Sequence, residues 1–218
     1  MSPRILILGG SRFIGYLTLC DLIAREHDVT LFNRQLRNPP NRFPKKTKFV
    51  RGDRNNSSDM DRLFKTDYDV VIDLSGYSPS HLNLIIPKYQ TAIGHYIFIS
   101  SSTVYETSFK GPLREDAPRI LQRGTYAGDK ALSEDLLLEA HHDSQFPVTI
   151  FRPQGVFGPY DPCQVGLIFY RLVNGVPILI PRCSNTRVNI LYVFDLVKAI
   201  NHTIYNSKAF GKIYNFCL

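Results

Sequence analysis

The sequence predicts an α/β fold, in which helices cover both faces of a doubly wound parallel sheet. Two observations support this prediction. Short apolar runs, typical of strands buried on both faces, alternate along the chain with segments of helical periodicity. The first of these runs, Ile5 to Leu8, leads directly into a glycine-rich turn that opens an amphipathic segment.

Strands are expected where apolar residues form short runs. These runs are Ile5 to Leu8, Val29 to Phe32, Phe49 to Val50, Val70 to Leu74, Tyr96 to Ile99, Val148 to Phe151 and Lys212 to Phe216. Helices are expected where apolar residues recur at helical spacing. These segments are Phe13 to about Glu26, Met60 to Phe64, Leu82 to Tyr89, Val193 to Tyr205, and Ala127 to Ala140, whose Leu132, Leu136 and Leu137 share one side.

The turn after the first strand has the residue types of a phosphate-binding turn. It consists of Gly9, Gly10, Ser11, Arg12, Phe13, Ile14 and Gly15. The early glycines allow a tight turn and a close approach of the backbone to a ligand, and Gly15 allows the helix to pack closely on the strand. The free N–H groups at the helix start favour a pyrophosphate. The turn therefore predicts dinucleotide binding, although a sharp turn can also use glycine without binding a ligand.

Three side chains form a candidate catalytic set. Tyr126 and Lys130 stand at positions i and i+4 of a helix, so they share one face. A neighbouring cation favours the phenolate, which suits a tyrosine acting as a general acid or base. Ser101 follows the strand Tyr96 to Ile99, at the carboxyl edge where parallel sheets bind ligands. The structural alternatives are an exposed helix pair and a polar strand end whose hydroxyls satisfy loop amides.

As a set, these motifs resemble those of the extended short-chain dehydrogenases/reductases, the NAD-dependent epimerase/dehydratase family. The turn resembles the family's Gly-x-x-Gly-x-x-Gly with Arg12 at the middle glycine, and Ser100 to Tyr105 resembles its Ser-Ser-x-x-Val-Tyr. Phe151 to Pro159 resembles its Arg-Pro-x-x-x-x-Gly-Pro, and Tyr192 to Leu196 its Tyr-Val-x-Asp-Leu, where Asp195 is interpreted as a helix-dipole residue. The resemblance spans essentially the whole chain and implies a Rossmann-type sheet. A subset with a Gly-Gly-x-Arg-Phe-Ile-Gly turn includes both sugar-nucleotide oxidoreductases and RNA-binding proteins.

The resemblance also implies roles for individual residues. Ser101 would orient the substrate oxygen, Tyr126 would transfer a proton, and Lys130 would bind the nicotinamide ribose and lower the pKa of Tyr126. Pro153 would lie against the nicotinamide. The expected cofactor-binding residues are Gly9, Gly10, Ser11, Arg12, Phe13, Ile14, Gly15, Asn33, Arg34, Asp53, Arg54, Leu74, Ser75, Gly76, Lys130 and Pro153.

We therefore expect an NAD(P)-dependent oxidoreductase or epimerase acting on the carbonyl or hydroxyl group of a sugar or sugar-nucleotide-like substrate. Ser102 and Thr103 stand where the family's dehydratases carry an Asp-Glu pair, so dehydration is not expected. Gly155 replaces an asparagine that many sugar-nucleotide enzymes place near the substrate phosphate, which puts that substrate class in question. No metal is expected, because Cys20, Cys163, Cys183 and Cys217 lack ligand spacing and a nearby histidine; they should be reduced.

The charge distribution supports an alternative function. Eight cations, opposed only by Asp53, lie in one stretch and account for the net charge of +7. They are Arg34, Arg37, Arg42, Lys45, Lys46, Lys48, Arg51 and Arg54. Such a stretch suits a phosphate-bearing ligand or nucleic acid, so a non-catalytic RNA-binding or regulatory protein is the alternative, which the intact Ser-Tyr-Lys set does not favour.

The second strand ends in a sequence that favours NADP over NAD. NAD-binding proteins usually carry a carboxylate there to bind the ribose 2′-hydroxyl. This chain carries Asn33 and Arg34 instead, and Arg12 and Arg37 could approach the same 2′-phosphate. The structural alternative is that Arg34 stacks on the adenine or points into solvent.

The chain divides into two expected regions. Residues 1–154 should form the dinucleotide-binding domain, and residues 155–218, which are interrupted by Gly-Pro and Asp-Pro pairs, a partial substrate lobe with elements that return to the first domain. The chain ends two residues after the last expected strand, so we expect either a fragment or a shortened form of the family's chain. Without a membrane-spanning run or a signal-peptide pattern, we expect a cytoplasmic protein, and a homodimer is left open.

Overall fold

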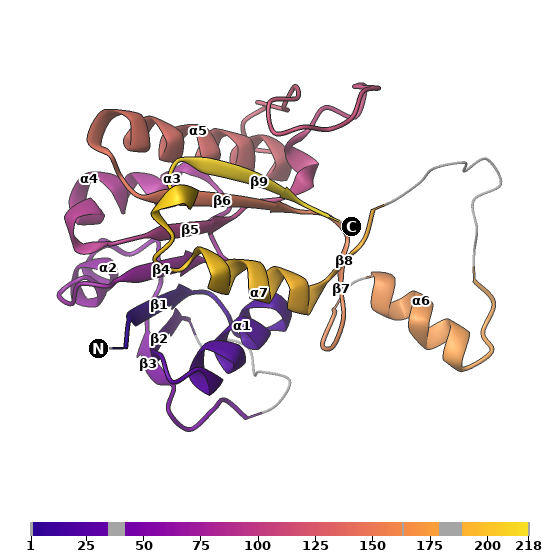
Figure 1. Ribbon diagram of the computed structural model, residues 1–218, viewed down its shortest axis with the longest axis horizontal. Helices are drawn as coiled ribbons and strands as arrows, with labels where there is room; N and C mark the ends of the chain where they lie inside the picture. The colour runs from indigo at the N-terminus through magenta and orange to yellow at the C-terminus, as the bar shows by residue number, and fades with distance from the viewer. Residues whose placement is uncertain (1, 35–41, 163, 179–188, 218) are drawn as a thin grey trace.

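The computed structural model describes residues 2–34, 42–162, 164–178 and 189–217. A seven-stranded parallel sheet forms its centre, in the order β3-β2-β1-β4-β5-β6-β9 (Figure 1). The strands are β1 (Arg4–Leu8), β2 (Asp28–Asn33), β3 (Lys48–Arg51), β4 (Val70–Asp73), β5 (Tyr96–Ile99), β6 (Val148–Pro153) and β9 (Lys212–Phe216). The strand order reverses between β1 and β4, so the predicted doubly wound sheet is confirmed.

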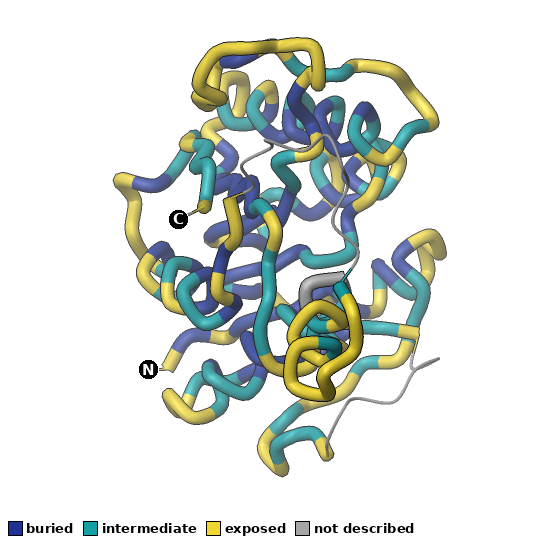
Figure 2. The backbone as a smooth tube through the Cα atoms, turned by 90° about the vertical axis from the view of Figure 1, so that its right-hand side faces the viewer, coloured by how far each residue is buried: buried dark blue, intermediate teal, exposed yellow. Residues whose placement is uncertain are grey.

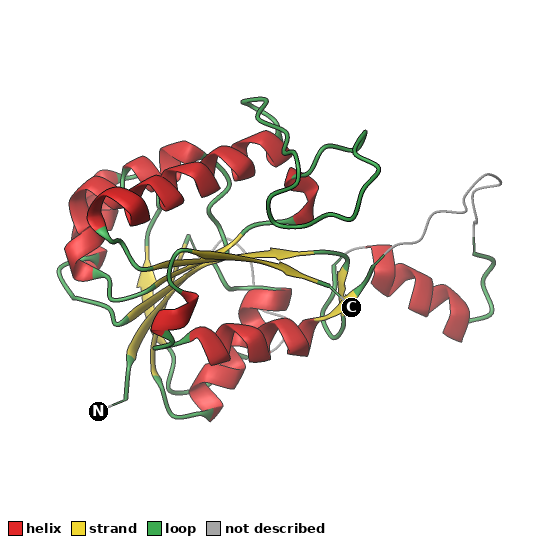
Figure 3. Cartoon of the chain, turned by 45° about the horizontal axis from the view of Figure 1, so that its top comes forward, coloured by secondary structure: helices red, strands yellow, loops and turns green. Residues whose placement is uncertain are grey.

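Helices cover both faces of this sheet (Figure 3). The helices α1 (Phe13–Ala24) and α7 (Val193–Thr203) pack together on one face. The other face carries α2 (Ser57–Leu63), α3 (Pro79–Asn83), α4 (Ile86–Tyr89) and α5 (Tyr126–Ser144). Because strand side chains alternate, Leu6 and Leu8 of β1 pack toward the second set, whereas Ile5 and Ile7 pack toward α1 and α7.

One expectation about the helices is wrong in detail. The segment from Leu82 to Tyr89 forms two short helices, because Pro87 has no N–H with which to continue a helix from α3. The three leucines expected on one side of α5 differ in burial: Leu137 is buried, whereas Leu132 and Leu136 are half-buried. The buried face of α5 instead carries Lys130, Ser133 and Glu134 among others.

The region after residue 154 contains elements that periodicity did not predict. A two-stranded sheet joins β7 (Val156–Phe157) to β8 (Leu191–Tyr192), and α6 (Gln164–Val173) projects away from the main sheet (Figure 1). Most side chains of α6 are exposed, in contrast to the buried centre of the sheet (Figure 2). By contrast, α7 and β9 return to the main sheet, where β9 pairs with β6. The division at residue 154 stays a prediction.

Within the described ranges, no helix is both long and apolar enough to cross a membrane.

We predict that Gly15→Ala lowers the free energy of unfolding by about 3 kcal/mol, because a Cβ at Gly15 would lie only 2.2 Å from the Gly10 Cα. Gly124→Ala is the control: nothing lies within 4 Å of its Cβ position, so only its φ of +79° opposes alanine, at a cost of about 1 kcal/mol. Chemical denaturation measures both losses. If both variants lost the same free energy of unfolding, the close contact between Gly15 and Gly10 would not determine how α1 packs on the turn.

Candidate active site

A cavity of about 1080 Å³ opens along the carboxyl ends of the central strands. Ser101, Tyr126 and Lys130 line it, together with every expected cofactor-binding residue except Gly76. Gly76 is buried below this surface, where a Cβ would meet the Asp73 Oδ2 at 2.5 Å. The sheet therefore brings the glycine turn and the candidate catalytic residues to one cavity, whereas Gly76 does not line it and its cofactor-binding role stays a prediction.

The glycine turn lies against this cavity with little side-chain cover. Gly9 and Gly10 have φ values of +99° and +83°, which favour glycine. A Cβ on Gly10 would lie 2.8 Å from the Ile7 Cγ2 and 2.9 Å from the Leu31 Cδ1. Arg12 precedes α1 and is exposed, without a side-chain bond that caps the helix. The turn thus lines the cavity, and the Arg12 side chain is not held by a bond to the helix end.

Helix α5 and the turn after β5 position the candidate catalytic residues. Thr125 caps α5, because its Oγ1 accepts from the Gly128 N–H at 3.1 Å, so Tyr126 begins the helix. The Ser101 Oγ accepts from the N–H and the hydroxyl of Thr103, at 3.2 and 2.9 Å. The Ser101 hydroxyl can therefore donate its own hydrogen to the phenol oxygen of Tyr126, and such a hydrogen bond favours the phenolate.

Lys130 is enclosed by protein. The residue is 2% exposed, and its ammonium donates to the Ile99 carbonyl at 2.6 Å. The Phe98 and Tyr77 rings lie 4.5 and 5.3 Å from its Nζ. Burial disfavours the charged form, which lowers the pKa of Lys130 from 10.5 to about 8.

The expected lowering of the Tyr126 pKa by Lys130 is not found. Burial raises the pKa of Tyr126 above 10.0, Tyr77 raises it further, and the Ser101 hydrogen bond offsets only part of this. The physical reason is that the Lys130 ammonium is directed at the backbone carbonyl of Ile99, to which it donates a hydrogen bond. The phenol is therefore protonated at neutral pH.

Tyr77 is a cavity residue that the sequence analysis missed. It follows β4, is 51% exposed, and its ring centroid lies 6.0 Å from that of Tyr126. Its backbone N–H donates to the His81 Nδ1 at 3.1 Å. A single tyrosine in a turn gives no periodic signal. Only its position in the loop after a predicted strand could have indicated a site residue.

A second missed group lies beneath the cavity. Asp73, at the end of β4, is fully buried and accepts from Arg54 at 2.7 and 2.9 Å. Tyr96 also donates to it, at 2.5 Å. Arg54 holds the pKa of the Asp73 carboxyl at about 2, despite burial. Arg54 lines the cavity as expected, but its charge is already compensated.

A third group joins α5 to β6. Arg152 and Glu134 are both buried, and the Arg152 Nη2 lies 2.6 Å from the Glu134 Oε2. Arg152 also donates to the Tyr105 hydroxyl at 2.6 Å, which donates in turn to Asn215 Oδ1 at 2.5 Å. Arg119 adds a bond to Glu134 at 3.2 Å. The sequence analysis missed this pair, because Glu134 and Arg152 lie 18 residues apart and only the fold brings them together.

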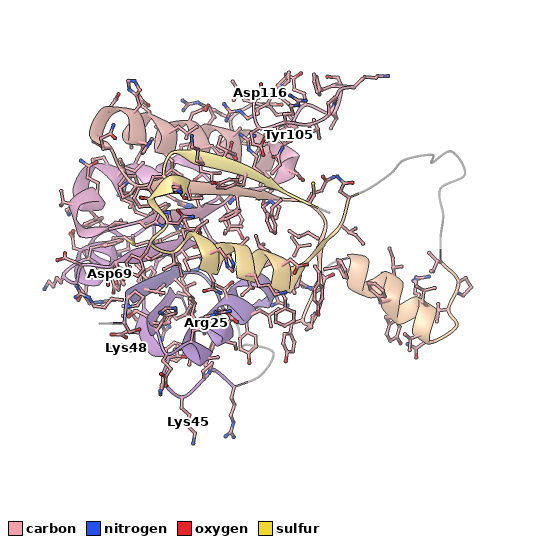
Figure 4. The ribbon with its side chains drawn as sticks, viewed as in Figure 1. Arg25, Lys45, Lys48, Asp69, Tyr105 and Asp116 are labelled. Carbon is pink, nitrogen blue, oxygen red and sulfur yellow. The ribbon has the colours of Figure 1, made fainter. Side chains whose placement is uncertain are left out.

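Folding compensates part of the basic stretch, because carboxylates from outside it join Asp53 in pairing with its cations. Arg34 lies 3.9 Å from Asp53, Lys46 4.0 Å from Glu26, and Lys48 2.7 Å from Asp28. Lys45 extends away from the fold (Figure 4). Arg37 lies outside the described residues, as do Cys163 and Cys183. Among the described residues, no group of three potential ligands could hold a metal.

The comparison with family models decides what kind of protein this is. The model of the NAD dependent epimerase/dehydratase family matches residues 5–217. The chain belongs to this family. The predicted membership of the extended short-chain dehydrogenases/reductases, the class of the NAD-dependent epimerases and dehydratases, is therefore confirmed.

Family members of known sequence are similar over nearly all of the chain. It is 31% identical to the chloroplast stem-loop binding protein of 41 kDa b of Arabidopsis thaliana, over 98% of this chain and 58% of that protein. It is 27% identical to dTDP-D-glucose 4,6-dehydratase of Mus musculus, over 98% of this chain and 68% of that protein. The chain thus spans between 58% and 68% of the length of these two relatives.

Solved structures of the family share the fold. The dTDP-glucose 4,6-dehydratase of Bacillus anthracis, in complex with NAD, has a TM-score of 0.83 at 20% identity, over 99% of this chain and 76% of that one. A UDP-N-acetylglucosamine 4-epimerase of Methanobrevibacter ruminantium has a TM-score of 0.84 at 22% identity, over 100% of this chain and 77% of that one. The epimerase/dehydratase fold is therefore shown.

We predict that Lys130→Met stabilises the protein near neutral pH. The folded-state pKa of about 8 lies below the unfolded value, so the unfolded chain binds more protons between them. The destabilisation caused by the buried Lys130 charge is therefore fully present below about pH 8. It disappears as the pH rises toward about 10.4, the pKa of lysine in the unfolded chain.

Removing the buried charge raises the free energy of unfolding, and losing the hydrogen bond to Ile99 offsets part of that gain. The net gain in the free energy of unfolding should be on the order of 2 kcal/mol near neutral pH. Urea denaturation near neutral pH and again near pH 10 measures it. A gain of the same size at both pH values would rule out the charge as its cause.

Proposed function

We propose that this chain is an NAD(P)-dependent oxidoreductase or epimerase acting on the carbonyl or hydroxyl group of a sugar or sugar-nucleotide-like substrate. The observation that carries the proposal is that Ser101, Tyr126 and Lys130 line the same cavity as the glycine turn. Relatives named as dTDP-D-glucose dehydratases and a UDP-glucose 4-epimerase support this class of substrate.

The residues of the cavity fit a dinucleotide. The positive φ values of Gly9 and Gly10 give the turn a conformation that leaves room for phosphates at the start of α1. The cavity volume of about 1080 Å³ is at the upper end of small-molecule sites, which suits a dinucleotide with a substrate beside it. When bound, the nicotinamide supplies hydride transfer. Pro153, which lines the cavity at the end of β6, is proposed to lie against it.

The side chains divide the remaining work. Ser101, fixed by its two bonds from Thr103, orients and polarises the substrate oxygen. Tyr126 is protonated at neutral pH because burial raises its pKa, so it could donate a proton to the oxygen of a carbonyl group whose carbon would accept the hydride. Lys130 holds the nicotinamide ribose. Dehydration is left out of the proposal, since Ser102 and Thr103 offer no carboxylate for elimination.

RNA binding is the second candidate, because the relative at 31% identity is named a stem-loop binding protein. The ion pairs of Arg34, Lys46, Lys48 and Arg54 weaken it, since part of the basic stretch is compensated within the fold. Titration with NADH and with stem-loop RNA over a range of salt separates the two functions, because phosphate contacts make RNA affinity fall steeply with salt.

We predict that Tyr126→Phe abolishes turnover and leaves cofactor affinity nearly unchanged, because it removes the transferable proton and keeps the ring. Lys130→Ala should reduce both. A screen of carbonyl substrates, followed at the absorbance of the reduced nicotinamide, gives the rate, and a fluorescence titration gives the affinity. Retention of most of the wild-type rate by Tyr126→Phe would contradict the assignment.

We also predict at least tenfold tighter binding of NADP(H) than of NAD(H), from two charge-assisted contacts of about 1.5 kcal/mol or more each. Arg34 and Arg12 line the same cavity, and their chain neighbours are in contact, because Asn33 donates to the Ser11 Oγ at 2.9 Å. The exposed contact of Arg34 with Asp53, at 3.9 Å, is weak enough for a 2′-phosphate to displace.

Two variants test this preference in opposite directions. Arg34→Ala should narrow the difference between the two dissociation constants, because it removes a cation from the phosphate site. Asp53→Asn should widen it, because it removes the carboxylate that competes for Arg34. Equal or tighter binding of NAD(H) by the wild-type protein would refute the preference.

A further inference from the structure

The buried pair of Arg54 and Asp73 organises a residue that does face the cavity. Asp73 is fully buried and Arg54 is 8% exposed, so neither has much surface to offer a ligand. Both hold Ser75, which lines the cavity. The Ser75 N–H donates to the Asp73 Oδ1 at 2.9 Å, and the Ser75 Oγ accepts from the Arg54 Nη1 at 2.8 Å.

These two bonds leave one donor uncommitted. A guanidinium only donates, so the hydroxyl hydrogen of Ser75 is not used in the bond from Arg54. No acceptor for that hydrogen is recorded within the described part of the chain. Ser75 also lies against the glycine turn: a Cβ built on Gly9 would be 3.1 Å from the Ser75 Cβ and 3.4 Å from its Oγ. The free O–H is thus held at the place where the turn receives phosphates.

We propose that Ser75 donates a hydrogen bond to an oxygen of the ADP half of the cofactor, and that Arg54 and Asp73 are the positioning residues that aim it. The inference rests on the proposed function, because it presumes a dinucleotide in this cavity. Arg54 was expected to bind the cofactor directly, whereas here it acts through Ser75. Because Tyr96 also donates to the Asp73 carboxylate, at 2.5 Å, rotation of the whole group would break several buried bonds.

The first test removes the donor. Ser75→Ala should weaken the binding of ADP and of NADH about tenfold, measured by calorimetry, and leave the binding of nicotinamide mononucleotide unchanged. Ser78→Ala is the matched control, because the Ser78 hydroxyl bonds to Ser80 at 2.8 Å and does not line the cavity. Wild-type affinity for ADP in Ser75→Ala overturns the inference. Failure of the wild-type chain to bind either NADH or ADP would overturn the proposed function instead.

The second test separates positioning from a merely structural role. The double variant Arg54→Met with Asp73→Asn removes both charges, so no unpaired charge stays buried. It should weaken ADP binding about tenfold when Ser75 is present and cause no further loss in a Ser75→Ala background. An equal loss in both backgrounds overturns the positioning role.

Arg54→Lys covers the case in which that double variant does not fold. It keeps the charge opposite Asp73 but loses the planar fork that reaches Ser75 as well. It should show the same tenfold loss of ADP affinity, again only when Ser75 is present. Unchanged ADP affinity in Arg54→Lys overturns the positioning role.

Discussion

The buried ion pair between Glu134 and Arg152 fixes the elements that carry the candidate catalytic residues. Glu134 lies one helical turn after Lys130 on α5, and Arg152 directly precedes Pro153 on β6. Removing two charges from water costs several kcal/mol per ion, so such a pair persists only where further bonds satisfy its remaining atoms. Tyr105 and Arg119 supply them here. The position of the helix on the sheet is thus set by directional bonds as well as by apolar packing.

Much of the fold follows from the sequence because a parallel sheet needs strands that are apolar on both faces. Tyr96–Ile99 and Lys212–Phe216 were predicted to the residue, and the order of strands and helices around them was right. The strand pair β7 and β8 was missed because each strand has two residues, too few for any pattern. The helix α6 was also missed, although its apolar residues recur at helical spacing.

The candidate site was predictable to the extent that it consists of motifs. The glycine turn, Ser101, Tyr126 and Lys130 line one cavity, as the spacing and the order along the sheet predicted. What escaped prediction is the set of charges beneath the cavity. Asp73 ends an apolar strand and Glu134 lies in a helix of mixed polarity, and nothing local in the sequence says that either is buried. Their partners come from 19 and 18 residues away, so only the fold pairs them.

The buried charges are not balanced, and this imbalance bears on how the site works. Among the described residues, three buried cations, Arg54, Lys130 and Arg152, face two buried carboxylates, Asp73 and Glu134, which leaves one positive charge when Lys130 is protonated. In a low-dielectric interior that excess is costly, and the pKa of Lys130, lowered to about 8, expresses the cost. An anionic dinucleotide in the cavity would favour the charged form of Lys130. If the cavity binds a dinucleotide as proposed, cofactor binding and protonation of Lys130 would then favour each other.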